Sequence, residues 1–573
     1  MISRGHALTA TLALASSLTA CGDAGTPGRA ALENLPAFCQ EVLPRVDAFL
    51  ADFSTPSGER YGGTAVVGSI GEMPNGMNAF VSSTVTNNQH QTFVNLMPLV
   101  RVDENLQPQP WLAESWEFNE DGTEVTFHLR DDVYWHDGTP TSAYDVEFTY
   151  RRAIDPQTAF PNASFWNYYD QGPDGVQVLD SLTVRLRMEP HSEPLDPWRS
   201  TAIMPRHLLE DVPPSELARH PYGSRCPVGN GPFVFESHRT DESWSFVRNP
   251  AFPEALGGPP YLERYVYRII PEQTTLLTEL LTENIDFYVA PGPDQVPQIE
   301  ADQQVDLHVF PYPGYDMVIW NTRRPQLSDA RVRQAIAIGT NRQEIVDAIR
   351  SGFGEIANSG VPPFHWAYAP ALADSLQYDP DRARELLDQA GWTDRDDDGI
   401  RENADGDPLE IAIKYNLGNQ QREDIAQIMQ AQLEPLGIRA RPQVVEWATL
   451  LDQINTPDVR DFDAVVIGWR VEFRLDDHEM LHSSSADDPF GWPGIQDPDL
   501  DTLLDRLQLV TDREEATPLW REYQYRLLET QPVMYLYFID RLAGVNRRLR
   551  GVELDIRGEW ASIQDWWIPA EER

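Results

Sequence analysis

Hydrophobic residues along most of the chain follow either the alternating spacing of strands or the three-to-four-residue spacing of helices. Residues 123–130 alternate, with Val125, Phe127 and Leu129 on one face, which predicts a half-buried strand. Residues 330–352 show helical spacing on both sides of a Gly-Thr-Asn break, which predicts two successive helices. Because helices and strands alternate through the second half, the pattern favours α/β lobes. The same criteria predict strands at 64–70, 462–469 and 533–539, and helices at 379–392, 422–437 and 516–530.

The length and composition are those of a multidomain globular protein. The chain has 573 residues, of which 41% are hydrophobic and 10% aromatic, enough for two or three separate cores. The formal charge is −45, from 45 basic and 90 acidic side chains. A nucleic-acid-binding protein carries a basic footprint, so this charge argues against a nucleic-acid partner.

The N-terminus has the features of a bacterial export signal. Arg4 precedes an apolar stretch at 7–20, which is too short to span a bilayer and leads into Leu-Thr-Ala-Cys. This ending resembles the lipobox, in which Cys21 is lipidated and becomes the first mature residue. We therefore predict a signal peptide at 1–20 and a lipid-anchored tether with a short helical segment at 21–60. The alternative is an ordinary signal peptide followed by a chance cysteine.

The rest of the chain contains no second apolar run near 18 residues. Membrane attachment is therefore predicted through the lipid anchor only, with the protein in the cell envelope, facing the periplasm or the exterior. Cys39 and Cys226 remain there. Outside the cytoplasm they could form a disulfide, and the alternative is two free, buried thiols.

Several stretches, taken in order, resemble a known family. Residues 112–156 contain Ala-Glu-Ser-Trp-Glu, an Asp-Gly turn, Phe-x-Leu-Arg, Val-x-Trp-x-Asp-Gly-x-Pro, and an Asp-Val before a predicted helix. Similar stretches continue collinearly from about Gly62 to the C-terminus, at 229–237, 263–287, 329–346, 463–469 and 497–507. This order resembles the bacterial extracellular solute-binding proteins of ABC importers, family 5, which include oligopeptide, dipeptide and nickel receptors.

The resemblance implies a receptor rather than an enzyme. It implies a periplasmic-binding-protein-like α/β fold with two lobes, a hinge between them and an inserted domain. The protein would be a monomer without a cofactor that passes a peptide to an ABC permease and its ATPase. The alternative within the family is a nickel or metal-chelate receptor. The family's pattern places lobe I at 61–105, 226–312 and 534–573, the inserted domain at 106–225 and lobe II at 313–533.

Glu472 is the residue that the resemblance marks for the ligand. It follows a Gly-Trp pair, where the family's peptide receptors hold the peptide α-ammonium with an Asp. A partly desolvated Glu carboxylate suits the same ammonium, but its longer side chain would move the anchor. Trp469, Arg470 and Phe473 would flank the ligand. The alternative is that Glu472 only pairs with Arg470 or Arg474 on a solvated edge.

A second ligand segment is implied in the first lobe. Residues 75–86 resemble a loop that offers hydroxyl groups and backbone to the ligand, so Ser83, Thr84 and Thr86 are candidates. A match to the basic residue with which dipeptide receptors hold a carboxylate is not evident. Lys414 is the nearby lysine, but strand alternation would point its side chain the wrong way.

An acidic loop offers a metal hypothesis. Asp394, Asp396 and Asp398 alternate and precede Gly399, as in the first half of an EF-hand calcium loop. The usual apolar residue at the eighth position is absent, and the twelfth position is Asp405 rather than Glu. The alternative to a structural calcium site is a solvated acidic turn.

Residues 478–482 spell His-Glu-Met-Leu-His, the H-E-x-x-H pattern of zinc peptidases. A working site needs a stable helix, a third ligand and an open metal position. Here the following serines limit the helix, and the carboxylates at a suitable distance, Asp501 and Asp505, fall inside a helix of the resembled family. A zinc peptidase is therefore the alternative function from another class.

His478 and His482 also support a different hypothesis. At i and i+4 they share one helix face and lie just after the predicted ligand segment. They could ligate a metal or metal chelate, or donate hydrogen bonds to a ligand. The alternative is two solvated or packed histidines.

Overall fold

One sheet of eleven strands runs through both halves of the molecule, which the computed structural model describes over residues 34–81, 84–471 and 475–573. The strands follow the order β15-β14-β16-β12-β17-β11-β1-β10-β9-β8, and β13 pairs with β17. Their bounds are β1 Thr64–Ser69, β8 Phe233–Arg239, β9 Ser243–Arg248, β10 Arg264–Ile269, β11 Phe287–Val289, β12 Val305–Trp320, β13 Gly354–Ile356, β14 Glu410–Asn416, β15 Arg439–Val445, β16 Ala464–Arg470 and β17 Val533–Asn546.

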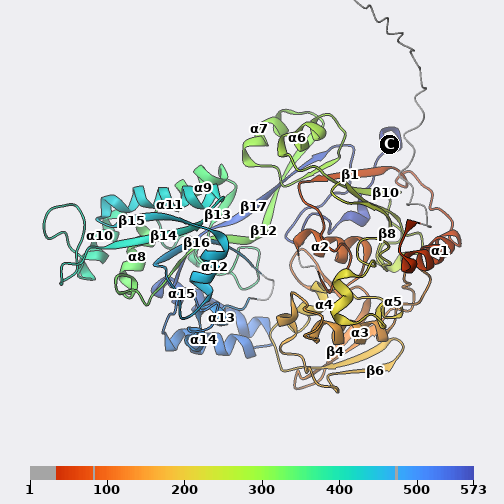
Figure 1. Ribbon diagram of the computed structural model, residues 1–573, viewed down its shortest axis with the longest axis horizontal. Helices are drawn as coiled ribbons and strands as arrows, with labels where there is room; N and C mark the ends of the chain where they lie inside the picture. The colour runs from red at the N-terminus through yellow and green to blue at the C-terminus, as the bar shows by residue number, and fades with distance from the viewer. Residues whose placement is uncertain (1–33, 82–83, 472–474) are drawn as a thin grey trace, which may run out of the picture.

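Strands β12 and β17 connect the two lobes. They pair antiparallel from Val305–Asn546 at one end to Ile319–Val533 at the other. Figure 1 shows them running between lobe I, which holds β1 and β8 to β11, and lobe II, which holds β13 to β16. A connection made of a few extended segments is the kind about which two lobes can close by a hinge motion.

Lobe II has a core on each face of its sheet, because its central strands are buried on both sides. Along β12, Val318 and Trp320 enter one core, whereas Met317 and Ile319 enter the other, as the two-residue period of a strand requires. The first core also contains residues of α8 to α11, and the second contains residues of α12 to α15. The helices are α8 Ala330–Gly339, α9 Arg342–Arg350, α10 Pro380–Gln389, α11 Gln420–Leu433, α12 Trp447–Asn455, α13 His478–Leu481, α14 Pro498–Leu509 and α15 Arg513–Thr530.

Lobe I packs an aromatic core against β1 and β8 to β11. His90 is fully buried in it, where its Nε2 lies 2.8 Å from the Tyr265 hydroxyl, and burial lowers the pKa of His90 to about 3. His90 is therefore a neutral core residue at physiological pH. It begins a π-helical turn, His90–Asn95, that continues α2. The helices of this lobe are α2 Val85–Gln89, α6 Gln273–Leu281 and α7 Val296–Ala301.

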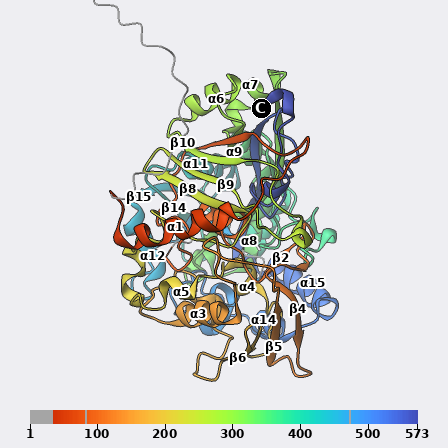
Figure 2. The same ribbon diagram turned by 90° about the vertical axis from the view of Figure 1, so that its right-hand side faces the viewer.

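The segment between β1 and β8 adds a separate layer. Figure 2 shows its β4 to β6 strands and α3 lying below the β8–β9 part of the main sheet. Trp166 and Trp198 meet edge to face in its core, with ring centroids 4.6 Å apart. Its sheet has the order β4-β5-β7-β6, and β2 pairs with β3. The elements are β2 Val100–Val102, β3 Pro108–Pro110, β4 Ala113–Phe118, β5 Glu124–Leu129, α3 Ala143–Ile154, β6 Val176–Asp180, β7 Thr183–Arg187, α4 Asp196–Ser200 and α5 Arg206–Leu209.

The N-terminal helix α1, Ala37–Ala51, is attached to this layer. Val42 and Val46 pack into its core, and Arg45 pairs with the buried carboxylate of Asp137 at 2.5 Å. A disulfide joins Cys39 to Cys226 across 187 residues of sequence. Closing so long a loop reduces the entropy of the unfolded chain, which stabilises the attachment.

Several predicted elements are confirmed. β5 buries Val125, Phe127 and Leu129, and α8 and α9 are separated at Asn341, whose side chain caps α9. The strand predicted at 533–539 extends to 546, because it pairs with β12 along its length. Within the described residues, no helix is both long and apolar enough to span a membrane. The predicted domain boundaries stay predictions.

Candidate functional site

Two adjoining cavities lie between the lobes. The arginine cavity, of about 200 Å³, is lined by Val85, Asn88, Gln89, Thr92, Phe93, Pro98, Arg101, Val102, Asn162, Phe165, Arg199, Ser200, Phe310, Pro311, Tyr312, Pro313, Arg470, Val471, Arg541, Asp555, Ile556, Arg557, Gly558 and Glu559. The acidic cavity, of about 380 Å³, is lined by Ser164, Phe165, Asn167, Asp196, Tyr315, Gly360, Trp469, Arg470, Val471, Leu475, Asp476, Asp477 and Glu479. They share Phe165, Arg470 and Val471, so they are two parts of one cleft.

An irregularity in β12 places backbone from the crossing strands in this cleft. The pairing of β12 with β17 shifts register between Pro311 and Tyr315. Proline cannot donate to a strand ladder, so such positions interrupt pairing and redirect the side chains nearby. As a result, Tyr312 lines the arginine cavity and Tyr315 lines the acidic one. Arg470 enters the cleft because β16 pairs with β12 at Gly314.

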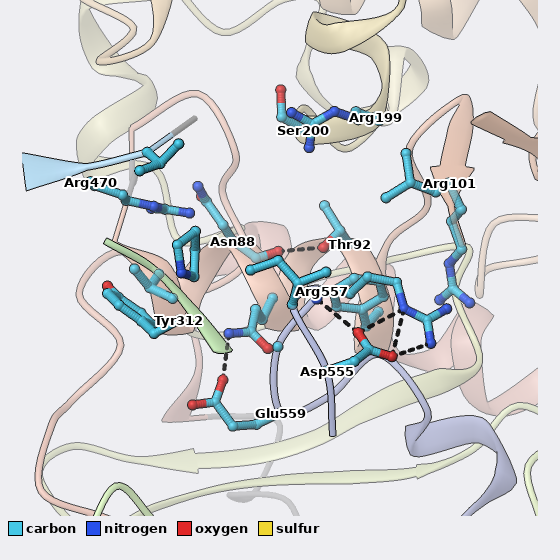
Figure 3. Close-up of a pocket in the computed structure, with 18 of the residues that line it drawn as sticks. Asn88, Thr92, Arg101, Arg199, Ser200, Tyr312, Arg470, Asp555, Arg557 and Glu559 are labelled. Atoms are coloured by element: carbon cyan, nitrogen blue, oxygen red, sulfur yellow. Dashed lines mark hydrogen bonds and ion pairs between the residues drawn. The ribbon is translucent and has the colours of Figure 1, made fainter. Parts of the chain in front are cut away.

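Five arginines line the arginine cavity, and their charges are unequally compensated. Arg541 pairs with Glu559 at 2.6 Å, and Arg557 pairs with Asp555 at 2.6 Å. Arg199 pairs with Asp196. In the described parts of the chain, Arg101 and Arg470 have no carboxylate within ion-pair distance. Figure 3 shows Arg470 and Arg101 on opposite sides of the cavity, with Asp555 and Glu559 along its lower edge.

Arg101 is held by aromatic rings instead of an acid. Its guanidinium lies 3.5 Å from the ring centre of Trp111 and 5.0 Å from that of Phe93. Burial, with a smaller contribution from the positive charge of Arg557, lowers the pKa of Arg101 to about 9, so it stays charged at neutral pH. Its Nε is buried and has no hydrogen-bond partner among the described residues. A cation in this state is costly, and an anionic group in the cavity would offset that cost.

The acidic cavity has the opposite character. Burial, together with the nearby charge of Asp476, raises the pKa of Asp477 to about 6. The Tyr523 hydroxyl donates a hydrogen bond to its carboxylate. Asp477 is therefore ionised at neutral pH and favours a cationic group that would partly replace its lost hydration.

Aromatic side chains form the walls between the charged groups. Trp469 meets Trp492 edge to face, with ring centroids 5.3 Å apart, and contacts Phe490 at 6.3 Å. Arg541 lies over the ring of Tyr312 at 5.1 Å. These contacts fix the rings, so the cleft presents rigid apolar surface between a cationic end and an anionic end.

The predicted ligand residues are distributed unevenly. Trp469 and Arg470 line the cleft, whereas Ser83, Glu472 and Phe473 lie outside the described residues. Thr84 caps α2 by accepting the backbone N–H of Asn87 at 3.3 Å, and the Thr86 carbonyl contacts the His90 ring. Neither threonine lines the arginine cavity or the acidic cavity. The same segment contributes Val85, Asn88, Gln89 and Thr92 instead.

The other predicted sites lie elsewhere in the chain. Cys21 falls outside the described residues. Carboxylate atoms of Asp394, Asp396 and Asp398 gather within 4.8 Å of one another, with Glu402 as the fourth member of the group. Counted from Asp394, Glu402 is the ninth residue of the loop, whereas the sequence pattern pointed to the twelfth residue, Asp405.

The H-E-x-x-H residues do not form one continuous helical site. α13 spans only His478–Leu481, so His482 lies after the helix. Glu479 lines the acidic cavity, whereas the two histidine rings stack on each other with centroids 4.1 Å apart and approach Asp505 of α14. Glu479, which would be the base of a peptidase, and the two imidazoles therefore face different surroundings.

The sequence pattern missed most of the charged groups that define the cleft. Arg101, Arg199, Arg541 and Arg557 are far apart in the chain and share no motif. Asp477 follows the ligand segment closely, but its burial against Tyr523 depends on α15. Lys414 donates to Gln453 at 2.9 Å and contacts Asp461, and it lines neither cavity.

The lobes also meet beyond the cleft. Arg513, at the start of α15, donates two hydrogen bonds of 3.1 Å to the carboxylate of Glu193 in the inserted layer. Its guanidinium lies 5.3 Å from the ring centre of Trp366. This bidentate pair ties lobe II to the layer that carries Phe165 and Arg199.

Comparison with known proteins gives a consistent result. The family model for "Bacterial extracellular solute-binding proteins, family 5 Middle" matches residues 107–491. The oligopeptide-binding protein AppA of Bacillus subtilis is 29% identical over 514 residues, which cover 88% of this chain and 92% of the relative.

Solved structures share the fold. The structure of AppA from Bacillus subtilis in complex with a nonapeptide has a TM-score of 0.71 at 27% identity, covering 89% of this chain and 100% of that one. The structure of NikZ from Campylobacter jejuni in complex with Ni(L-His) has a TM-score of 0.69 at 23% identity, covering 88% and 99%. Because the identity to NikZ is only 23%, this similarity is evidence for the fold alone.

Proposed function

Because the chain belongs to the bacterial extracellular solute-binding proteins, family 5, we propose that it captures peptides between its two lobes and delivers them to an ABC permease and its ATPase. The observation that carries the proposal is the division of one cleft into a cationic and an anionic part. A peptide is a zwitterion with an apolar middle, which suits such a cleft.

The acidic cavity is assigned to the peptide ammonium. Asp477 supplies a carboxylate there, and Glu472 lies in sequence between Val471 and Leu475, which both line that cavity. The arginine cavity is assigned to a carboxylate of the ligand, either terminal or on a side chain. Arg101 and Arg470 support this assignment, because neither has a carboxylate within ion-pair distance in the described chain.

The sequence supports an export route and an anchor. We propose that residues 1–20 are removed and that lipidated Cys21 holds the receptor at the membrane, in the cell envelope. A tethered receptor stays near its permease while its lobes remain in water. Labelling with a radioactive fatty acid, lost in Cys21→Ala, would test the anchor separately from the ligand.

The ligand is tested by native mass spectrometry of the purified protein, followed by thermal unfolding with a peptide pool. Peptides should co-purify with the protein and raise its Tm. A ligand at about one hundred times its Kd stabilises a protein by about 2.7 kcal/mol. If no peptide co-purifies and the pool leaves Tm unchanged, the peptide proposal fails. A nickel–histidine chelate that raises Tm in its place would support the metal-chelate receptor.

A further inference from the structure

Three potential metal ligands converge beside the cleft without lining it. His478 Nε2 lies 3.7 Å from Asp505 Oδ1, and His482 Nε2 lies 3.5 Å from the same oxygen. One donor atom from each residue falls within 4.8 Å of the others. The histidines come from α13 and the residue after it, and Asp505 comes from α14, so two separate elements supply the ligands.

These N–O separations are longer than hydrogen bonds and close to the spacing of ligand atoms around one ion, but the two rings stack nearly parallel, so one ring must turn for both Nε2 lone pairs to reach that ion. An N–H to carboxylate hydrogen bond spans about 2.7–3.2 Å, which is shorter than either distance. Zinc binds imidazole nitrogen and carboxylate oxygen at about 2.0–2.2 Å, so neighbouring ligand atoms of a tetrahedral site lie about 3.4 Å apart. The two nitrogen–oxygen distances are close to that edge.

His482 provides an independent observation. Its side chain is 13% exposed, and its Nε2 is buried and has no hydrogen-bond partner among the described residues. A buried ring nitrogen without a partner is costly unless something binds it. Its Nδ1 accepts the backbone N–H of Ser484 at 3.0 Å and lies 2.6 Å from Ser484 Oγ. In this arrangement the neutral ring carries its proton on Nε2, so Nε2 can bind a metal once that proton has moved to Nδ1, where Ser484 Oγ accepts it in a hydrogen bond.

The environment also suits a cation. Asp501 Oδ1 lies 3.9 Å from His482 Nε2 and accepts the backbone N–H of Ser483 at 2.8 Å. Asp501 therefore positions the turn that carries His482 and adds negative charge near the nitrogen. Imidazole donors favour zinc, nickel or copper over magnesium or calcium.

We propose that His478, His482 and Asp505 bind one divalent transition-metal ion, which fastens α13 to α14. The ion is not the transported ligand, because none of the three side chains lines the cleft. The ion would affect the cleft indirectly, because Glu479 of α13 and the preceding Asp477 form part of the acidic cavity. On binding, the single proton of the His482 ring moves from Nε2 to Nδ1 and forms a hydrogen bond to Ser484 Oγ in place of the bond from the Ser484 backbone N–H, so the ring stays neutral.

The proposal is tested by calorimetric titration of ZnCl₂, and separately NiCl₂, into protein made without a polyhistidine tag and stripped with a chelator. We expect one equivalent to bind and to raise Tm. His482→Ala and Asp505→Asn should each weaken binding by at least about tenfold. Asp505 is 62% exposed, so its substitution leaves the fold intact even if the histidine variant is unstable. Cobalt should give a visible absorption spectrum that disappears in both variants.

The matched control is Asp394→Asn/Asp398→Asn, which alters the acidic loop and should leave zinc binding unchanged. The proposal is overturned if wild-type protein binds neither metal, if Asp505→Asn binds as well as wild type, or if the acidic-loop variant loses the site. The titration needs no peptide, so its result is independent of the ligand assigned to the cleft.

Discussion

The two cavities of the cleft differ in how their charges are assembled. The acidic cavity takes most of its charged groups from one stretch, residues 469–479, whereas the arginine cavity draws Arg101, Arg470, Arg541 and Arg557 from distant parts of the chain. In the arginine cavity, neighbouring acids already neutralise several guanidiniums. Counting charges therefore overstates its attraction for anions, and the binding strength should depend on Arg101 and Arg470.

The acidic cavity differs in that it depends on one buried carboxylate. Its decisive carboxylate, Asp477, is charged at neutral pH despite burial, and the raised pKa means that the fold itself disfavours that charge. Such a group is poorly explained as a stabilising feature. It is better explained as a group kept for a cationic partner, at a cost to the stability of the free protein.

The largest effect is expected at Arg470, the charged residue among the three that both cavities share. Arg470→Glu removes a cation that has no ion-pair partner among the described residues and puts a carboxylate in its place. We expect peptide affinity to fall by about a hundredfold, or about 3 kcal/mol, as measured by calorimetry. Arg521→Glu makes the same change of charge on an exposed position of α15 and should alter affinity little. Equal losses in the two variants would mean that only overall charge matters.

Asp477→Asn should lower the affinity for peptide and raise the stability of the free protein. We expect peptide affinity to fall by about tenfold, because the ammonium loses a charged partner. The same variant should be more stable than wild type at pH 7, by about 2–3 kcal/mol, since a buried charge is removed. Urea unfolding measures this, with exposed Asp458→Asn as the control. A variant that is destabilised at pH 7 would contradict the assignment.

The pH dependence follows from the pKa of about 6 for Asp477. Its folded-state pKa lies above the unfolded value, so its unfavourable contribution to stability is absent below about pH 4 and grows as pH rises to about 6. Ligand binding should change in the opposite sense and weaken by about tenfold between pH 7 and pH 5, as the carboxylate is protonated. Calorimetry at both pH values should show a smaller change in Asp477→Asn. The same pH dependence in both proteins would exclude Asp477 as its source.

A smaller effect is expected where the lobes meet outside both cavities. Arg513→Gln removes the bidentate pair with Glu193, and the loss of about 1 kcal/mol should raise the rate of peptide release by about fivefold in stopped-flow measurements. Glu193→Gln should have a similar effect, and the double variant should add little to either. Additive effects would show that the two residues act independently.

The fold was largely predictable, because its elements carry clear periodicity. β5, α8, α9 and β16 lie within one or a few residues of the predicted positions. The full length of β17 was not predictable, because its last residues form a strand through pairing with β12 and not through an alternating pattern of their own. Local spacing predicts an element, but only tertiary pairing decides where a long strand ends.

The site was predictable only where it is local in sequence. The Gly-Trp pair led to Trp469 and Arg470, which do line the cleft. Arg101 could not be found in this way, because its importance comes from Trp111, Phe93 and the fact that no carboxylate of the described residues lies within ion-pair distance. Glu472, the predicted ammonium partner, lies outside the described residues, so its role stays a prediction.

The central claim is that the acidic cavity holds the peptide ammonium. It is tested most directly by comparing one co-purified peptide with its N-acetylated form, in wild type, Asp477→Asn and Glu472→Gln. Acetylation should weaken binding to wild type by at least about tenfold and should weaken binding much less in at least one of the variants, because the ammonium has already lost its partner there. An acetylated peptide that binds wild type as tightly as the free peptide would contradict the account.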